Sequence, residues 1–279
     1  MPPSARFLMC PPEYYGIEYE INPWMDRLQP ADHQQANAQW QALHQLLLDT
    51  GASIALAEPQ KGLPDLVFSA NAALVYQQRV ILSHFLHEQR QAEQPYWERC
   101  LTDLGFQVDA APAGMSFEGA GDALFCGTTL FAGYRIRSDA LGHQKIATDL
   151  GIPLIPLELV DNYYYHLDTC FCPLSANQAI YFPPAFDPYG RQVLSQTIED
   201  LIAVDAEEAA RFACNAVVVG KTVITNSGCP QLHETLAGRG YEPQETHLSE
   251  FVKAGGSAKC LTLRLDGEEA ADWETGGDD

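Results

Sequence analysis

Stretches rich in β-branched and aromatic residues recur along the chain, and most are followed, after a short polar break, by a second such stretch. Pairs of this form predict antiparallel hairpins, because these residues pack well on a pleated surface. A fifth region ends in the alternating sequence Leu261-Thr262-Leu263-Arg264, which is typical of a half-buried strand. The predicted hairpins and this strand region are 68–76 with 79–82, 119–125 with 129–134, 166–172 with 178–182, 212–219 with 221–225, and 255–265.

The segments between these strands have apolar residues at the spacing of amphipathic helices. Gly51 and Gly240 follow two of the segments, and glycine commonly ends a helix because it enters the left-handed conformation without strain. The alternation of hairpins and helices predicts the α/β fold class. The predicted helices are 31–48, 91–104, 139–150, 199–213 and 232–239.

One short polar residue or cysteine occurs near the start of each unit, and successive positions are separated by 45 to 51 residues. A near-constant period in this range indicates a repeated supersecondary unit, such as the blade of a propeller. We therefore predict a five-bladed α/β propeller that forms a single domain over residues 1–265, with a strand near residues 5–9 closing the ring. The polar positions are expected to meet around a central cavity. They are Asn71, Asp122, Asp168, Asn215 and Cys260.

The charge of the chain limits its partners. Its 16 basic and 37 acidic residues give a formal net charge of −21, which argues against binding to nucleic acid or to an anionic membrane. We expect a small or cationic partner. The segment 266–279 contains seven acids and no base, and its composition predicts a disordered tail.

The ends and the cysteines indicate a cytoplasmic protein. The N-terminus lacks the continuous apolar run of a signal peptide, and no apolar run is long enough to span a membrane. Eight cysteines in 279 residues are too sparse for a disulfide scaffold, so we expect free thiols. Cys170 and Cys172 lie near His166, but their spacing matches no usual zinc pattern, and we predict no metal site.

Cys260 is the candidate nucleophile. It follows Lys259 and a Gly255-Gly256 pair at the expected start of a strand, where a thiol that faces a pocket is biased towards thiolate. The alternative is a buried structural cysteine, which is the more common role of an isolated free cysteine. His166 and Asp168 would share one side of a strand through their spacing of two residues. Glu118 and Asp122 lie in a Gly-rich turn, although short polar residues near strands often serve only as caps.

Together, these motifs resemble the guanidine-modifying (pentein) superfamily. The similarity is greatest to the arginine dihydrolase domain of cyanobacterial arginine-degrading enzymes, and next to dimethylarginine dimethylaminohydrolases. It extends from about residue 9 to residue 265 and implies a five-bladed α/β propeller. The motifs that carry it are 18–25 (Glu-Tyr-Glu-Ile-Asn-Pro-Trp-Met), 63–71 (Leu-Pro-Asp-Leu-Val-Phe-Ser-Ala-Asn), 117–122 (Phe-Glu-Gly-Ala-Gly-Asp), 165–168 (Tyr-His-Leu-Asp) and 253–260 (Lys-Ala-Gly-Gly-Ser-Ala-Lys-Cys).

The resemblance implies a catalytic set. In it, Cys260 is the nucleophile, His166 is the general acid and base, and Glu118 orients His166. Asp168 would hold the guanidinium group of the substrate, because a carboxylate accepts two parallel hydrogen bonds from such a cation.

The resemblance also implies substrate-binding residues. Arg90 and Arg137 match binders of the substrate α-carboxylate, although Arg135 is an alternative to Arg137. Asn22 and Asn71 match positions that dihydrolases use for a second hydrolysis. The amide of Asn71 both accepts and donates hydrogen bonds, so it suits a neutral ureido intermediate better than an aspartate does. The remaining substrate-side residues in the matching motifs are Phe68, Gly121 and Asp122.

The implied function is hydrolysis of L-arginine to ornithine, ammonia and carbon dioxide through a covalent thiouronium on Cys260, without a metal or organic cofactor. Alternatives that stay open are a dimethylarginine dimethylaminohydrolase, a citrulline-forming arginine deiminase, an amidinotransferase and a non-catalytic binding scaffold. Whether the chain forms a homo-oligomer is also left open.

Overall fold

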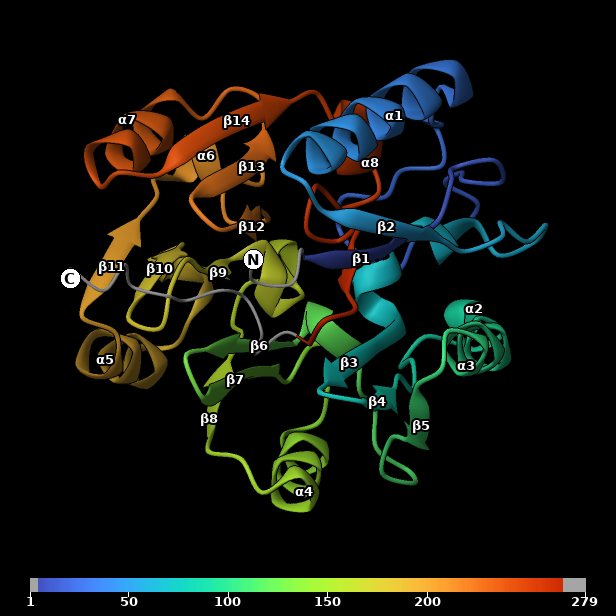
Figure 1. Cartoon of the computed structure of the whole chain (residues 1–279), viewed down its shortest axis with the longest axis horizontal. Helices are drawn as coiled ribbons and strands as arrows, with labels where there is room; N and C mark the ends of the chain where they lie inside the picture. Colours follow the sequence, from blue (N-terminus) through green and yellow to red (C-terminus); the bar gives the residue numbers. More distant parts are fainter. Residues whose placement is uncertain (1–4, 268–279) are drawn as a thin grey trace.

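The computed structural model describes residues 5–267, which form five three-stranded sheets arranged as a ring. Figure 1 shows the longer helices on the outer side of this ring. The strands are β1 (Arg6–Met9), β2 (Ser53–Leu56), β3 (Ala73–Tyr76), β4 (Arg79–Leu82), β5 (Gln107–Ala110), β6 (Ala123–Cys126), β7 (Thr129–Tyr134), β8 (Leu154–Glu158), β9 (Phe171–Pro173), β10 (Gln178–Tyr181), β11 (Asp200–Ala203), β12 (Val217–Val219), β13 (Thr222–Asn226), β14 (Glu242–Thr246) and β15 (Leu263–Arg264). The helices are α1 (His33–Asp49), α2 (Glu88–Gln91), α3 (Gln94–Asp103), α4 (Ala140–Leu150), α5 (Pro188–Thr197), α6 (Ala206–Ala209), α7 (Pro230–Gly238) and α8 (Ser249–Val252).

The five sheets share one topology, which confirms the predicted five-bladed α/β propeller. In the sheet β6-β7-β8, β6 is antiparallel to β7 and β7 is parallel to β8. A parallel pair needs a crossover connection, and α4 provides it here. The third strand of each sheet was not predicted from the sequence because most of its residues are half-buried or exposed, and in β14 (Glu-Pro-Gln-Glu-Thr) most are also polar.

The N-terminal strand closes the ring. β1 pairs antiparallel with β15, with Phe7 opposite Arg264 and Leu8 opposite Leu263, and parallel with β2 on its other side. The prediction that a strand near residues 5–9 closes the ring is therefore confirmed.

Four of the predicted helices are confirmed as α1, α3, α4 and α7. The prediction of a helix over 199–213 is wrong, because that region contains β11 and the single-turn helix α6. The long helix of this unit is α5, which begins at Pro188 directly after Asp187. The side chain of Asp187 accepts hydrogen bonds from the backbone N–H groups of Tyr189 and Gly190, which caps the helix.

The polar position of each unit lies on a turn before the first strand of the sheet, not on the strand itself. Asn71 lies in the 3₁₀ turn Ser69–Ala72, and Asp168 lies in the 3₁₀ turn Leu167–Thr169. The prediction that His166 and Asp168 share a strand face is therefore wrong. Cys260 also precedes its strand, since β15 begins at Leu263. The turns place the polar side chains at the ends of the inner strands, near the axis of the ring.

The predicted acidic tail begins at Asp266, whose carboxylate accepts hydrogen bonds from Arg264 at 3.0 and 3.1 Å. The rest of that prediction, residues 268–279, lies outside the described residues. Over residues 5–267, none of the helices combines the length and the apolar character required to cross a bilayer.

Candidate active site

A small cavity lies where these turns and the loop before α1 meet. Cys260 borders it together with two buried arginines, Arg90 and Arg137. Three more of the predicted site residues, Asn22, Phe68 and Asn71, also line it. The structure thus brings together side chains that are more than 200 residues apart in the sequence.

The sulfur of Cys260 lies 3.3 Å from Oδ2 of Asp168. Burial and the negative charge of Asp168 raise the pKa of the Cys260 thiol well above its usual value. The expectation that Lys259 biases this thiol towards thiolate is therefore wrong for the free site. A thiol proton is what allows the sulfur and the carboxylate to approach each other so closely, since two anions would repel.

His166, Glu118 and Arg137 form a buried chain of hydrogen bonds. Nε2 of His166 lies 2.7 Å from Oε2 of Glu118, and Nη1 of Arg137 donates to the same oxygen at 3.0 Å. Burial would raise the pKa of Glu118, but Arg137 and His166 hold it below its usual range. Burial lowers the pKa of His166 to about 4, so its imidazole is neutral at neutral pH. An anchored neutral imidazole can accept a proton, which is the property expected of a general base.

Gly121, which the resemblance places on the substrate side, lies where a side chain would not fit. A Cβ atom at this position would collide with Nδ2 of Asn71 and would lie 3.4 Å from the His166 ring. Any side chain here would displace both groups, so glycine is required by packing.

The side chain of Arg90 is buried and already has several hydrogen-bond partners within the protein. Its guanidinium donates to both carboxylate oxygens of Glu93 at 2.7 and 2.9 Å, and to Oδ1 of Asn71 at 2.9 Å. Nη2 also donates to the backbone oxygen of Asp65 at 3.3 Å. These contacts fix the side chain of Asn71, and the assignment of Arg90 to a substrate carboxylate stays a prediction.

The structure distinguishes Arg137 from Arg135. Arg137 borders the cavity and stacks over the ring of Tyr165, with its guanidinium carbon 4.6 Å from the ring centroid. Arg135 pairs with Glu158 at 3.2 Å, and 56% of its side-chain surface is exposed. Arg137 is therefore the arginine that faces the site.

Asn22 and Asp122 support the local backbone. Nδ2 of Asn22 donates to the backbone oxygen of Ala254 at 3.0 Å, which joins the loop before α1 to the segment that leads to Cys260. Asp122 accepts hydrogen bonds from Ser138 Oγ at 2.7 Å and from the backbone N–H of Leu167 at 3.0 Å. The second of these bonds holds the turn that carries His166 and Asp168.

The sequence did not predict that Asp65 and Tyr165 border the cavity, although both lie inside motifs that carried the resemblance. Asn215 was predicted from the repeat to approach the axis of the ring, but no role was assigned to it. Its side chain contacts the sulfur of Cys260.

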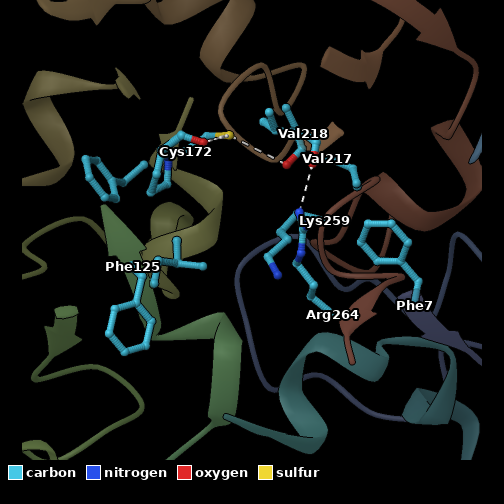
Figure 2. Close-up of a pocket in the computed structure, with 11 residues that line it drawn as sticks. Phe7, Phe125, Cys172, Val217, Val218, Lys259 and Arg264 are labelled. Atoms are coloured by element: carbon cyan, nitrogen blue, oxygen red, sulfur yellow. Dashed lines mark hydrogen bonds between the residues drawn. The ribbon is translucent and has the colours of Figure 1, made fainter. Parts of the chain in front are cut away.

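A second and larger cavity, shown in Figure 2, lies between the inner strands of the ring. Its walls are mostly apolar and include Phe7, Phe125 and Val217. Lys259 borders this cavity, whereas the next residue, Cys260, borders the smaller one. The guanidinium of Arg264, also in Figure 2, donates to Val218 and pairs with Asp266.

Comparison with known sequences identifies relatives of this chain. The family model for N,N dimethylarginine dimethylhydrolase, eukaryotic, matches residues 17–266. The chain is 46% identical over 270 residues to the bifunctional arginine dihydrolase/ornithine cyclodeaminase ArgZ of Synechocystis sp., covering 95% of this chain but 38% of that protein. It is 38% identical over 264 residues to the N(G),N(G)-dimethylarginine dimethylaminohydrolase of Mycobacterium tuberculosis, covering 95% of this chain and 87% of that protein.

Solved structures give the same relationship. The N-terminal domain of ArgZ bound to product superposes with a TM-score of 0.91 at 46% identity, covering 94% of this chain and 98% of that one. A structure of that domain covalently bonded to a reaction intermediate superposes with a TM-score of 0.90, covering 94% and 97% of the two chains. The resemblance read from the sequence motifs is therefore confirmed. With a family match over most of its length, this chain belongs to the dimethylarginine dimethylaminohydrolase family.

Proposed function

We propose that the chain is an arginine dihydrolase that hydrolyses L-arginine to ornithine, carbon dioxide and ammonia, with Cys260 as the nucleophile. Relatives at 46% identity are named for this activity, and one of them has been solved with a covalently bonded intermediate. The position of Asp168 supports the proposal. A carboxylate 3.3 Å from the sulfur can hold a guanidinium so that its central carbon faces Cys260.

The observation that favours two rounds of hydrolysis is the side-chain amide of Asn71. The guanidinium of Arg90 can only donate hydrogen bonds, so the amide atom of Asn71 that faces it must be Oδ1. Nδ2 of Asn71 therefore faces away from Arg90. Among residues 5–267, Nδ2 is a buried donor without a hydrogen-bond acceptor. A buried unsatisfied donor is costly, and the oxygen of a ureido group would satisfy it. Asn71 borders the cavity and is suited to retain that intermediate.

In the first round, the sulfur of Cys260 attacks the guanidinium carbon and a carbon–sulfur bond forms. His166 accepts the thiol proton and transfers it to the departing nitrogen, which leaves as ammonia. The substrate cation opposes the two causes that raise the pKa of Cys260, namely burial and the charge of Asp168. Glu118 stabilises the imidazolium that forms on His166. The product of these steps is a thiouronium on Cys260.

Water then replaces the sulfur. His166 accepts a proton from the water as a carbon–oxygen bond forms, the carbon–sulfur bond breaks, and the ureido compound citrulline results. In the second round Cys260 attacks the ureido carbon, a second ammonia leaves, and hydrolysis of the thiocarbamate gives a carbamate that decomposes to ornithine and carbon dioxide. Each proton transfer through His166 contributes about 10²- to 10⁴-fold in rate.

The family match also supports a second candidate function, the hydrolysis of dimethylarginine to citrulline and dimethylamine. The same nucleophile and base would act, but the reaction would stop after one round. The donor of Asn71 would then have no part in the reaction.

Product stoichiometry distinguishes the two candidates. The purified chain is supplied with L-arginine or with asymmetric dimethylarginine, and ammonia, citrulline and ornithine are quantified over time. A dihydrolase yields about two molecules of ammonia for each ornithine, with little free citrulline. Accumulation of citrulline from L-arginine, or activity on the methylated substrate alone, would contradict the proposal.

A further inference from the structure

Asn215 occupies the polar position of the unit that contains β12 and β13. It is fully buried, and its backbone N–H donates to the oxygen of Phe212 at 2.9 Å. Phe212 has a φ of 62°, which is unusual for a residue with a side chain and stores strain in this turn. Such strain persists where the surrounding structure holds it, so the location of Asn215 is strongly constrained.

The side chain of Asn215 bridges the nucleophile and the turn of Asp168. Its Oδ1 accepts the backbone N–H of Cys260 at 3.2 Å. Its Nδ2 donates to the sulfur of Cys260 at 3.1 Å and to the backbone oxygen of Asp168 at 2.9 Å. The backbone oxygen of Asn215 also accepts the N–H of Lys259 at 3.2 Å.

These partners fix the orientation of the amide. A backbone N–H can only donate, so Oδ1 must face Cys260 N, and the –NH₂ group must then face the sulfur and the Asp168 oxygen. An N–H donor binds a sulfur anion more strongly than a neutral thiol, since hydrogen bonds to charged groups are about twice as strong as neutral ones. The hydrogen bond from Asn215 therefore lowers the pKa of the Cys260 thiol, whereas burial and Asp168 raise it.

We propose that Asn215 is a catalytic residue, which donates a hydrogen bond to the sulfur of Cys260 when it carries negative charge and fixes the distance between that sulfur and Asp168. The sulfur is anionic both when it attacks and when it leaves, so the donor acts in each step. The inference concerns the nucleophile that the proposed function uses, but its test does not require turnover of any guanidine.

The test compares two asparagines of one unit. Asn226 is also buried, and its side chain also makes two backbone bonds, to Arg211 and from Leu248, both at 3.0 Å. Its side-chain hydrogen bonds do not include Cys260. The variants Asn215→Ala and Asn226→Ala therefore both remove a buried amide, but only the first removes the donor to sulfur.

The readout is alkylation of Cys260 by iodoacetamide as a function of pH, followed by mass spectrometry of the peptide that contains Cys260. We expect Asn215→Ala to slow this alkylation about 10- to 100-fold at neutral pH and to shift its midpoint to higher pH, because a hydrogen bond to a charged group is worth about 1.5–3 kcal/mol. Asn226→Ala should leave the profile unchanged even where it lowers the melting temperature.

Equal profiles for Asn215→Ala and Asn226→Ala would overturn the proposal and leave Asn215 a structural residue. If Asn215→Ala does not fold, Asn215→Asp keeps the shape and the acceptor for Cys260 N while replacing the donor by an acid, and a normal profile in that variant would overturn it equally. If Asn215→Ala changes the alkylation profile but the parent protein does not hydrolyse L-arginine, the role of Asn215 is supported and the proposed function is rejected. The two failures are therefore distinguishable.

Discussion

Two cavities within the described part of the ring differ in size and in chemistry. The larger of the two has mostly apolar walls supplied by inner strands. The smaller is lined by turns and is bordered by Cys260, Asn71, Arg90 and Arg137. The volume of a cavity therefore does not identify the reactive site in this molecule. The smaller cavity is distinguished by buried arginines that are held in place by hydrogen bonds to buried acids and amides, such as Glu93 and Glu118.

Two consecutive residues border different cavities. Lys259 borders the larger and Cys260 the smaller, and the turn that carries both is held by Asn215. Variants on the two sides of this turn should therefore have very different effects, although they lie next to each other in the sequence.

The largest effect is expected for Cys260→Ser. Loss of the sulfur nucleophile should lower turnover of L-arginine by at least about 10⁴-fold, because a serine hydroxyl at this site is a weak nucleophile. The matched control is Lys259→Met, which alters the other cavity and should change turnover by less than about twofold. Both are measured as ornithine formation, with the melting temperature as a check of folding. Substantial turnover by Cys260→Ser, or equal losses in both variants, would remove the distinction between the cavities.

The next effect is expected for Glu118→Gln. The neutral amide no longer stabilises an imidazolium on His166, and it leaves Arg137 without its anionic partner. We expect kcat to fall about 10²-fold or more, with a smaller change in KM. Steady-state kinetics with L-arginine measure both constants. A change confined to KM would show that Glu118 acts in binding and not in proton transfer.

A smaller effect on rate, with a change of product, is expected for Asn71→Asp. The carboxylate can still accept the hydrogen bond from Arg90, but it offers no donor to a ureido oxygen. The second round should slow about tenfold or more relative to the first, so that citrulline accumulates. The ratio of citrulline to ornithine measures this change. An unchanged ratio would exclude Asn71 as the group that retains the intermediate.

The last effect concerns stability and not turnover, because the free energy of unfolding should depend on pH. The pKa of His166 is lowered from 6.5 to about 4 in the folded state, so the unfolded state binds more protons between these values. This contribution to stability is complete above pH 6.5 and is lost as pH falls towards 4. It amounts to roughly 3 kcal/mol over the whole interval.

Denaturant unfolding at several pH values between 4.5 and 7 measures this loss. His143 is also buried, and its pKa is likewise lowered to about 4 by burial. The variant His166→Asn should therefore lose only about half of the dependence. The same slope in the variant and the parent protein would show that His166 is not held neutral by burial.

The repeat of polar positions predicted the ring and its axis, because a fixed period survives differences in local sequence. The outer strands could not be predicted in this way. β2 and β5, for example, each have exposed residues at both ends and half-buried ones between, so they lack an alternating pattern. The helix predicted over 199–213 was wrong for a related reason, since the acidic residues there lie in or beside a half-buried strand and a single-turn helix.

The resemblance predicted that Glu118 orients His166, and the 2.7 Å contact between them agrees with it. It did not predict that Arg137 also binds Glu118, or that Asn215 binds Cys260. Glu118 and Arg137 are 19 residues apart and Asn215 and Cys260 are 45 residues apart, and both contacts depend on how the folded turns position these side chains. The sequence period identifies which residues approach the axis but not which atoms meet there.

The central claim is that the sulfur of Cys260 forms a covalent bond to the substrate in the smaller cavity. The most direct test is to mix the protein with L-arginine, quench with acid within the first turnovers, and analyse the cysteine-containing peptides by mass spectrometry. The account predicts that the peptide with Cys260 gains the mass of arginine less ammonia. Ornithine formation with no such adduct at any quench time, or with the adduct on another cysteine, would contradict it.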